Sequence, residues 1–184
     1  MKRQAGFTIT ELLVVATIIA ILLAIGVPSY HYVTNSSRMS AEINGLLGDL
    51  QYARAEAIKE GQPVSLCVSS DGQNCSGSTN WQNGWIVFPD PNQTVTPAAG
   101  SILRQQTAFT GTTPDTLSPD TAVSSVSFNR DGFAQSAGGG AFPATILTLH
   151  ETTNSSNYTR CLAISAVGLA QTETHINPPV PPCA

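Results

Sequence analysis

Hydrophobic and polar positions divide the chain into three parts. The first, Leu12–Tyr30, carries no charged residue and consists mostly of Leu, Ile, Val and Ala. In the second, Met39–Ile58, apolar residues recur at helical spacing and charged residues lie mostly between them. Gly61, with Pro63 soon after it, is a helix stop. The pattern predicts a single bent helix of about fifty residues, apolar all round in its first half and amphipathic in its second.

The third part, beyond Pro63, alternates short apolar stretches with loops rich in Ser, Thr, Asn and Gly. The predicted strands are 64–68, 85–88, 102–105, 123–128, 145–150 and 161–165. Turn signals separate them: Asp71-Gly72, Asn83-Gly84 and Asp131-Gly132. We therefore predict an α+β fold, in which an antiparallel sheet or small β-sandwich covers the apolar stripe of the helix.

Two segments of the predicted head are expected to be mobile surface loops, because they contain few hydrophobic residues. They are Pro89–Gly100 and Thr107–Thr121. Trp81 and Trp85, which flank Asn83-Gly84, are interpreted as packing residues of a strand and turn; an aromatic ligand platform is the alternative.

The uncharged segment approaches the length needed to cross the roughly 30 Å hydrocarbon core of a bilayer. Lys2 and Arg3 precede it and place its N-terminal side in the cytoplasm and the rest of the chain outside. A cleaved secretory signal peptide is the alternative, because Ala24–Pro28 tolerates a small-residue cleavage pattern. Gly26 and Pro28 near the outer end predict a kink or a local melt of the helix.

Glu11 argues for the membrane anchor, because a carboxylate in an apolar run costs up to about 2.5–3.5 kcal/mol, the value at the centre of a membrane helix, and usually occurs only where it has a partner. The stretch Gly6-Phe7-Thr8-Ile9-Thr10-Glu11-Leu12-Leu13-Val14-Val15 closely resembles the class III leader junction of type IV pilins and type II secretion pseudopilins. In that family a prepilin peptidase cuts after the glycine and the new N-terminal residue is N-methylated. The resemblance implies cleavage between Gly6 and Phe7 and methylation of Phe7.

The spacing of Phe7 and Glu11 has a physical rationale in a filament of parallel helices. The α-amino group of Phe7 in one subunit can be neutralised by the Glu11 carboxylate of a neighbour, which favours one register of subunit docking. The implied domains are a leader at 1–6, a transmembrane and filament-core helix at 7–30, the amphipathic half of the helix at 31–61 and a β-rich head at 62–184.

The head resembles the GspH/FimT branch of this superfamily, through Cys67–Cys75, Trp81–Phe88, Ile102–Arg104, Val126–Gly132 and Arg160–Ser165. This branch contains minor pilins of type IV pili and minor pseudopilins of type II secretion. The resemblance implies a minor pilin, with a minor pseudopilin as the alternative. Its partners would be the prepilin peptidase and other pilins or pseudopilins. The chain would cross the bacterial inner membrane once, with a periplasmic head, before joining a pilus or pseudopilus.

Four cysteines, Cys67, Cys75, Cys161 and Cys183, follow the membrane segment, in the part expected to face an oxidising compartment. They allow three pairings, of which we favour Cys67–Cys75 and Cys161–Cys183. The second pair would tie the Pro-rich tail to the sheet. Zinc is the rival interpretation, but no two cysteines have metal-ligand spacing and the three histidines form no pair, so no metal is expected.

Composition narrows the remaining function classes. The chain of 184 residues suits one domain, and 11% charged residues is well below the roughly 25% of soluble domains. Eight Lys+Arg against twelve Asp+Glu argue against a nucleic-acid protein. Some FimT-like minor pilins bind DNA through a G-R-x-R stretch, but the matching Gly168-Leu169-Ala170-Gln171 lacks both arginines. With no catalytic motif, we expect neither enzyme activity nor a cofactor.

Overall fold

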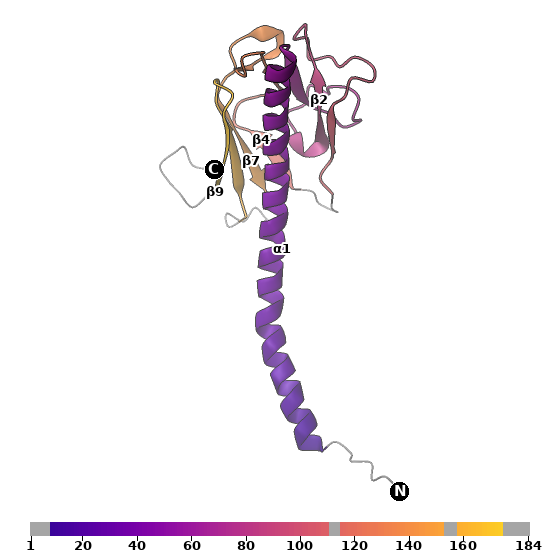
Figure 1. Ribbon diagram of the computed structural model, residues 1–184. Helices are drawn as coiled ribbons and strands as arrows, with labels where there is room; N and C mark the ends of the chain where they lie inside the picture. The colour runs from indigo at the N-terminus through magenta and orange to yellow at the C-terminus, as the bar shows by residue number, and fades with distance from the viewer. Residues whose placement is uncertain (1–7, 111–114, 153–157, 175–184) are drawn as a thin grey trace. The chain divides into compact units, whose positions relative to one another are not determined.

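The computed structural model describes residues 8–110, 115–152 and 158–174. It divides into two compact units, Met1–Arg38 and Met39–Ala184, and the long helix α1 (Ile9–Glu60) contributes to both (Figure 1). The single long helix predicted from the apolar pattern is therefore confirmed. It continues without interruption through Gly26 and Pro28, so the helix does not melt there, and the kink stays a prediction.

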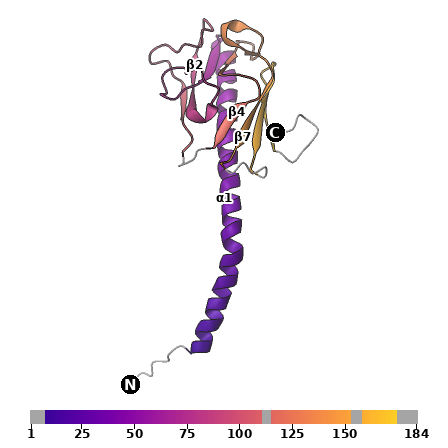
Figure 2. The same cartoon turned by 180° about the vertical axis from the view of Figure 1, so that it is seen from behind.

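The second unit contains two antiparallel sheets. The first has the order β3-β2-β1-β5-β6, with β1 at Val64–Val68, β2 at Gly84–Pro89, β3 at Arg104–Thr107, β5 at Ser125–Phe128 and β6 at Ala134–Gln135. The second has the order β4-β7-β8-β9, with β4 at Thr116–Pro119, β7 at Thr145–His150, β8 at Arg160–Ile164 and β9 at Ala170–Thr174. Two short 3₁₀ turns, η1 (Trp81–Asn83) and η2 (Ala137–Gly139), complete the described elements. Seen from behind, β4 and β7 lie in front of α1 (Figure 2), and their buried Leu117 and Leu147 share its hydrophobic core.

One hydrophobic core joins both sheets to the second half of α1. The helix buries one side-chain stripe, Met39, Ile43, Leu46, Leu50, Ala53 and Ala57. The same cluster contains Leu66 and Phe128 of the first sheet and Leu147 and Leu162 of the second. Burying a side chain of this size stabilises the fold by about 1.5–3 kcal/mol, so this stripe fixes the helix onto the sheets. The α+β fold predicted from sequence is confirmed.

The strand predictions differ from the structure at the sheet edges. β1 and β7 have the predicted bounds, whereas β3 begins two residues later than predicted. β4, β6 and β9 were not predicted, and the interpretation of 107–121 as a mobile loop is wrong for β4, because Leu117 is fully buried in the core. Asn83-Gly84 is the junction of η1 and β2 and not a hairpin turn.

The segment Pro89–Gly100 is also more closely attached to the head than predicted. Asp90 is buried, and its carboxylate accepts hydrogen bonds from the Ser65 hydroxyl at 2.8 Å and from the backbone N–H groups of Thr94 and Val95 at 3.0 and 2.8 Å. These bonds hold the first turn of the segment against β1. Its remaining residues up to Gly100 are mostly exposed, as predicted for a surface loop.

Candidate functional site

The first turn of α1 brings Thr8 and Glu11 together. The Thr8 hydroxyl accepts a hydrogen bond from the backbone N–H of Glu11 at 3.3 Å, which is the geometry of a helix N-cap. The pair has the Thr-x-x-Glu spacing of a capping box, and a negative charge is favourable at this end of a helix. The Thr-x-x-Glu spacing is the sequence signal for this cap, which was not predicted. Gly6 and Phe7 lie outside the described residues, so cleavage and methylation stay predictions.

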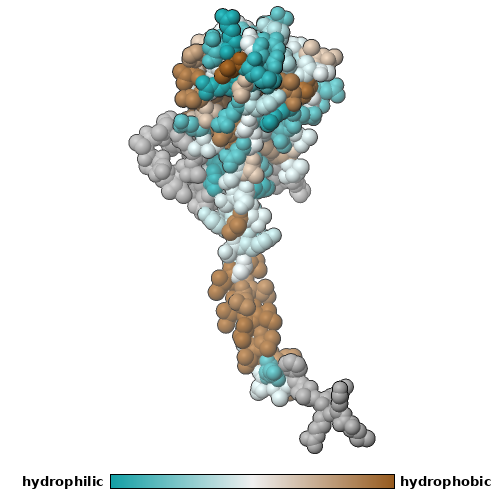
Figure 3. Space-filling view, in the orientation of Figure 1, coloured by the Kyte–Doolittle hydropathy of each residue, from teal (hydrophilic) through white to brown (hydrophobic). Residues whose placement is uncertain are grey.

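The apolar half of α1 is exposed along its whole surface within the described chain. Its most apolar window has a mean hydropathy of 2.7 and none of that window is buried (Figure 3). By length and composition this helix can cross a bilayer. An all-round apolar surface needs either lipid or other helices around it, because water makes its exposure unfavourable.

The disulfide Cys67–Cys75 closes the loop after β1, as predicted, with the two Cα atoms 5.6 Å apart. Inside this loop Asp71 accepts hydrogen bonds from the backbone N–H groups of Gln73 and Asn74, both at 2.8 Å. Hydrogen bonds from the Asn74 side chain and backbone hold the pKa of Asp71 well below its usual range. Cys161 is also disulfide-bonded. Its predicted partner Cys183 lies outside the described residues, so that pairing stays a prediction.

Asp49 on α1 links the helix to the first sheet through both carboxylate oxygens. Oδ2 accepts a hydrogen bond from Nε1 of the buried Trp85 at 2.8 Å, and Oδ1 lies 3.0 Å from Nη1 of Arg104. The Arg104 guanidinium also stacks on the ring of Tyr52, 4.0 Å from its centre. The other tryptophan, Trp81, is fully buried and its Nε1 donates to the Val123 carbonyl at 3.0 Å. The predicted packing role of both tryptophans is confirmed.

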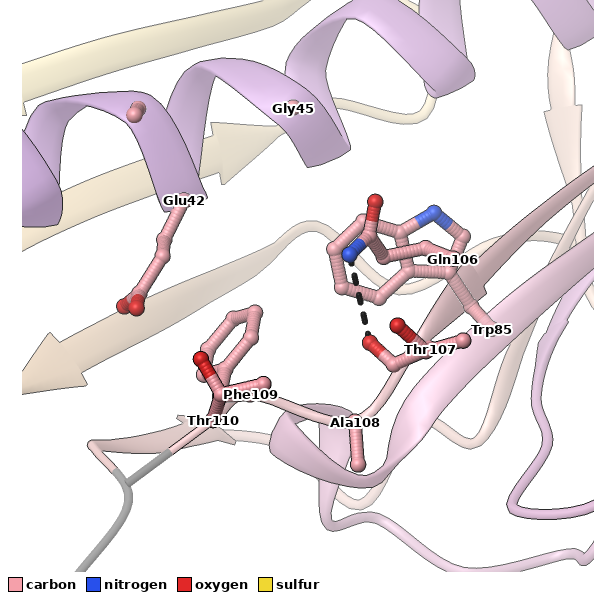
Figure 4. A pocket seen from close by; sticks show the side chains of 9 residues that line it. Glu42, Gly45, Trp85, Gln106, Thr107, Ala108, Phe109 and Thr110 are labelled. Atoms are coloured by element: carbon pink, nitrogen blue, oxygen red, sulfur yellow. Dashed lines mark hydrogen bonds between the residues drawn. The ribbon is translucent and has the colours of Figure 1, made fainter.

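A small pocket of about 260 Å³ lies between α1 and the segment that follows β3 (Figure 4). The rings of Trp85 and Phe109 meet edge to face on its inner side, with centres 6.1 Å apart. Gln106 donates to the Thr107 carbonyl at 3.2 Å, and Glu42 is the one titratable side chain among the lining residues. These residues bring together no nucleophile and base. The pocket is below the roughly 300–1,000 Å³ of typical small-molecule sites.

No group of three metal-ligating side chains comes together among the residues that the structure describes. Glu11 lies at the start of the exposed apolar helix, and the cysteines lie in the head.

The fold and the N-terminal helix define a pilin-like protein: an exposed apolar helix whose second half packs on an antiparallel β head. A family model described as "Type II transport protein GspH" matches residues 42–168, and the "Prokaryotic N-terminal methylation motif" matches residues 1–27. The chain belongs to the GspH family. This family is of a structural pilin type, and membership implies assembly with other pilins and processing by a prepilin peptidase.

Curated relatives agree with this assignment. The chain is 34% identical over 113 residues to "Prepilin peptidase-dependent protein D" of Escherichia coli (strain K12), and the aligned region covers 60% of this chain and 66% of that protein. It is 38% identical over 80 residues to a "Fimbrial protein" of Pseudomonas aeruginosa, and this aligned region covers 43% of this chain and 51% of that protein. The chain thus spans about half to two thirds of the length of these relatives.

A solved structure has the same fold. The crystal structure of the type IV minor pilin FimU of Pseudomonas aeruginosa matches with a TM-score of 0.52 over 82% of this chain and 98% of that chain, at 19% identity. At this identity the match shows the fold alone. Together with this fold, the two family models identify the chain as a pilin or pseudopilin of the type IV pilin family with an N-terminal methylation motif. Its apolar helix fits anchoring in the inner membrane.

Proposed function

We propose that this chain is a minor pilin. It is processed between Gly6 and Phe7, methylated on Phe7, and incorporated into a type IV pilus or used to prime its assembly. Before assembly the helix holds it in the inner membrane with the head in the periplasm. The observation that carries the proposal is Glu11, the one acidic residue in the apolar half of α1, at the first turn of a helix whose surface is exposed.

The Glu11 carboxylate is unfavourable in an apolar environment unless its charge is compensated. Insertion scales give about 2.5–3.5 kcal/mol for an acidic residue at the centre of a membrane helix, and less near its end. The Thr8 cap and the positive end of the helix dipole offset part of this cost in the single subunit. Pairing with the α-amino group of Phe7 on a neighbouring subunit offsets the rest, so the charge favours assembly.

A minor pseudopilin of type II secretion is the second candidate function, and the description of the matching family model favours it. The relative named as a fimbrial protein favours the pilus. DNA binding receives no support from the β8–β9 turn, where Val167 and Leu169 are exposed apolar side chains. Neither candidate function requires a catalytic step by this chain.

The test expresses the full chain in a bacterium that has a prepilin peptidase and type IV pili. Glu11→Ala should be processed to mature size but be depleted from sheared filaments, and Glu11→Gln should behave alike because it also lacks the charge. Wild-type amounts of either variant in the filaments would contradict the charge-pairing argument.

A second variant tests processing separately. Gly6→Val should accumulate at precursor size, because the branched side chain adds bulk beside the bond that is cut. Mature-sized Gly6→Val protein would refute the cleavage site. Finding the wild type in the pseudopilus fraction, and not in pili, would replace the pilus with the secretion machine.

A further inference from the structure

Exposed apolar side chains gather at the end of the head where α1 terminates. They are Ile58, Phe133, Val167 and Leu169, each about half exposed, and we name them together the apolar end. Isolated exposed apolar residues are normal on a protein surface, but a contiguous group marks an interaction site.

One backbone hydrogen bond and two close approaches at glycines bring these side chains together from distant parts of the sequence. The backbone N–H of Ala134 donates to the Ala166 carbonyl at 3.2 Å, so the β5–β6 turn crosses the β8–β9 turn. A side chain at Gly168 would collide with the Gly132 carbonyl oxygen, and one at Gly132 would lie 2.9 Å from Cδ1 of Ile58. The two turns and the last turn of α1 therefore form one surface.

An apolar groove of about 520 Å³ continues this surface over the second sheet. Val167 and Leu169 belong both to the apolar end and to the groove wall, and Ile146 of β7 and Ala163 of β8 also line it. Its volume lies within the range of established binding pockets and is twice that of the pocket beside Trp85. The groove has room for a large side chain together with part of the segment that carries it.

Asp120 is the one charged residue among those that line the groove. Its Oδ1 accepts hydrogen bonds from the Thr145 hydroxyl at 2.8 Å and from the backbone N–H of Ile146 at 2.9 Å. Burial raises the pKa of Asp120, but these hydrogen bonds, and others donated by the backbone and side chain of Thr121, outweigh burial, so the pKa lies below its ordinary value. The groove thus presents a fixed negative charge beside an apolar wall.

We propose that the apolar end and its groove bind the head of a different filament subunit, which inserts a large apolar side chain next to a Lys or Arg that pairs with Asp120. The inference rests on the proposed function, because a filament supplies the neighbouring subunits. The negative charge of Asp120 favours a protein partner over a lipid surface or a nucleic acid. A carboxylate at the groove repels the phosphates of lipid headgroups and of nucleic acid and attracts a cationic side chain.

The same reasoning disfavours a second copy of this chain at this surface. If two copies faced each other groove to groove, their Asp120 carboxylates would repel each other. Lys59 follows Ile58 in sequence and Arg130 lies within the β5–β6 turn, so charged residues border the apolar end. An apolar centre with a charged rim is the usual composition of a protein–protein interface, and the aromatic Phe133 is of the type enriched in such centres.

The test places the photoreactive residue p-benzoylphenylalanine at position 169 of the full chain, in the bacterium that assembles the filament. Illumination should yield a cross-link to another pilin subunit, with the cross-linked peptide containing an apolar residue beside a Lys or Arg. The matched control carries the same residue in place of Thr96, an exposed position of the loop after β2. It should give a much weaker cross-link to the same partner subunit, because position 96 lies outside the proposed contact surface.

Two substitutions then test the chemistry, with the photoreactive residue placed at Phe133. Leu169→Glu should abolish the cross-link, and Asp120→Asn should weaken it about tenfold, whereas Asp120→Glu should retain it. Asn keeps an acceptor oxygen for the N–H of Ile146, so the fold is preserved. Unchanged cross-linking in Leu169→Glu and Asp120→Asn would overturn the inference.

The remaining outcomes separate the inference from the proposed function. A cross-link to lipid, to DNA or to a second copy of this chain, or equal yields from positions 169 and 96, overturns the inference. So does a wild-type chain that is present in filaments but yields no cross-link at 169. If the wild type is absent from pili while position 169 still cross-links to another pilin subunit, the pilus assignment fails and the inference stands.

Discussion

Asp49 is the polar link between α1 and the first sheet, so its removal should destabilise the head measurably. The perturbation is Asp49→Ala, with Asp49→Asn as the matched control. Alanine removes both acceptor oxygens, whereas asparagine keeps one oxygen that can still accept the hydrogen bond from the Trp85 indole. The two variants therefore separate the hydrogen bond from the charge.

The magnitude follows from the burial of the two donors. Trp85 is 1% exposed, so its N–H would be left unpaired in Asp49→Ala, at a cost of about 1–3 kcal/mol. The Arg104 side chain is 49% exposed, so its ion pair with Asp49 is screened by solvent and contributes at most about 1 kcal/mol. Asp49→Ala should cost about 2–3 kcal/mol in the free energy of unfolding, and Asp49→Asn about 1 kcal/mol or less.

The assay is thermal unfolding of the full chain in detergent, followed by near-ultraviolet circular dichroism of the tryptophans. At about 2–4 °C per kcal/mol for a domain of this size, Asp49→Ala should lower Tm by about 4–12 °C, and Asp49→Asn by about 4 °C or less. Equal losses in the two variants would refute the reasoning, because the charge and not the buried indole would then carry the effect.

Three further predictions follow from contacts in the head. Replacing Cys67 and Cys75 together by Ser should cost about 2–3 kcal/mol, because the disulfide closes a loop of sequence separation 8, and a Tm equal to that of the oxidised wild type would contradict this. Hydrogen bonds keep the pKa of Asp120 low in the folded state, so the ionised carboxylate stabilises the fold at pH values above the unfolded-state pKa of about 3.9, and this stabilisation is lost as the pH falls through the lower folded-state pKa. Asp120→Asn should therefore make the free energy of unfolding depend less on pH below about pH 4, and an unchanged pH dependence would refute the assignment. Gly168→Ala should lower stability by more than about 1 kcal/mol in denaturant unfolding, since Gly168 has φ of +77° and a side chain there meets the Gly132 carbonyl, and a neutral effect would contradict the crossing of the two turns.

Sequence patterns predicted the central strands well, because these strands bury most of their side chains and are therefore rich in apolar residues. β1 is buried at every position and β7 alternates buried and partly buried residues, and both were predicted with their observed bounds. β4 and β9 are the two edges of the second sheet and have polar sequences, Thr-Leu-Ser-Pro and Ala-Gln-Thr-Glu-Thr. β6 has only two residues. An edge strand buries too few side chains for a periodic pattern to show it.

The candidate sites divide in the same way. Glu11 and the cysteines could be recognised from the sequence, because a carboxylate in an apolar run and cysteines after a membrane segment each indicate a role without any knowledge of the fold. The Asp49, Trp85 and Arg104 cluster joins three elements and depends on the register of β2 against β3, which pairs Trp85 with Gln106 and Val87 with Arg104. The apolar end depends on two turns that cross in space. Spatial convergence of this kind leaves no local signal in the sequence.

The most direct test of the filament-subunit account is the intact mass and N-terminal sequence of the chain recovered from membranes of a host that has a prepilin peptidase. The account predicts a chain that begins at N-methylated Phe7, retains the whole apolar helix and has every cysteine oxidised. A chain that begins after the apolar segment would contradict it, because the helix and Glu11 would then be absent from the mature protein.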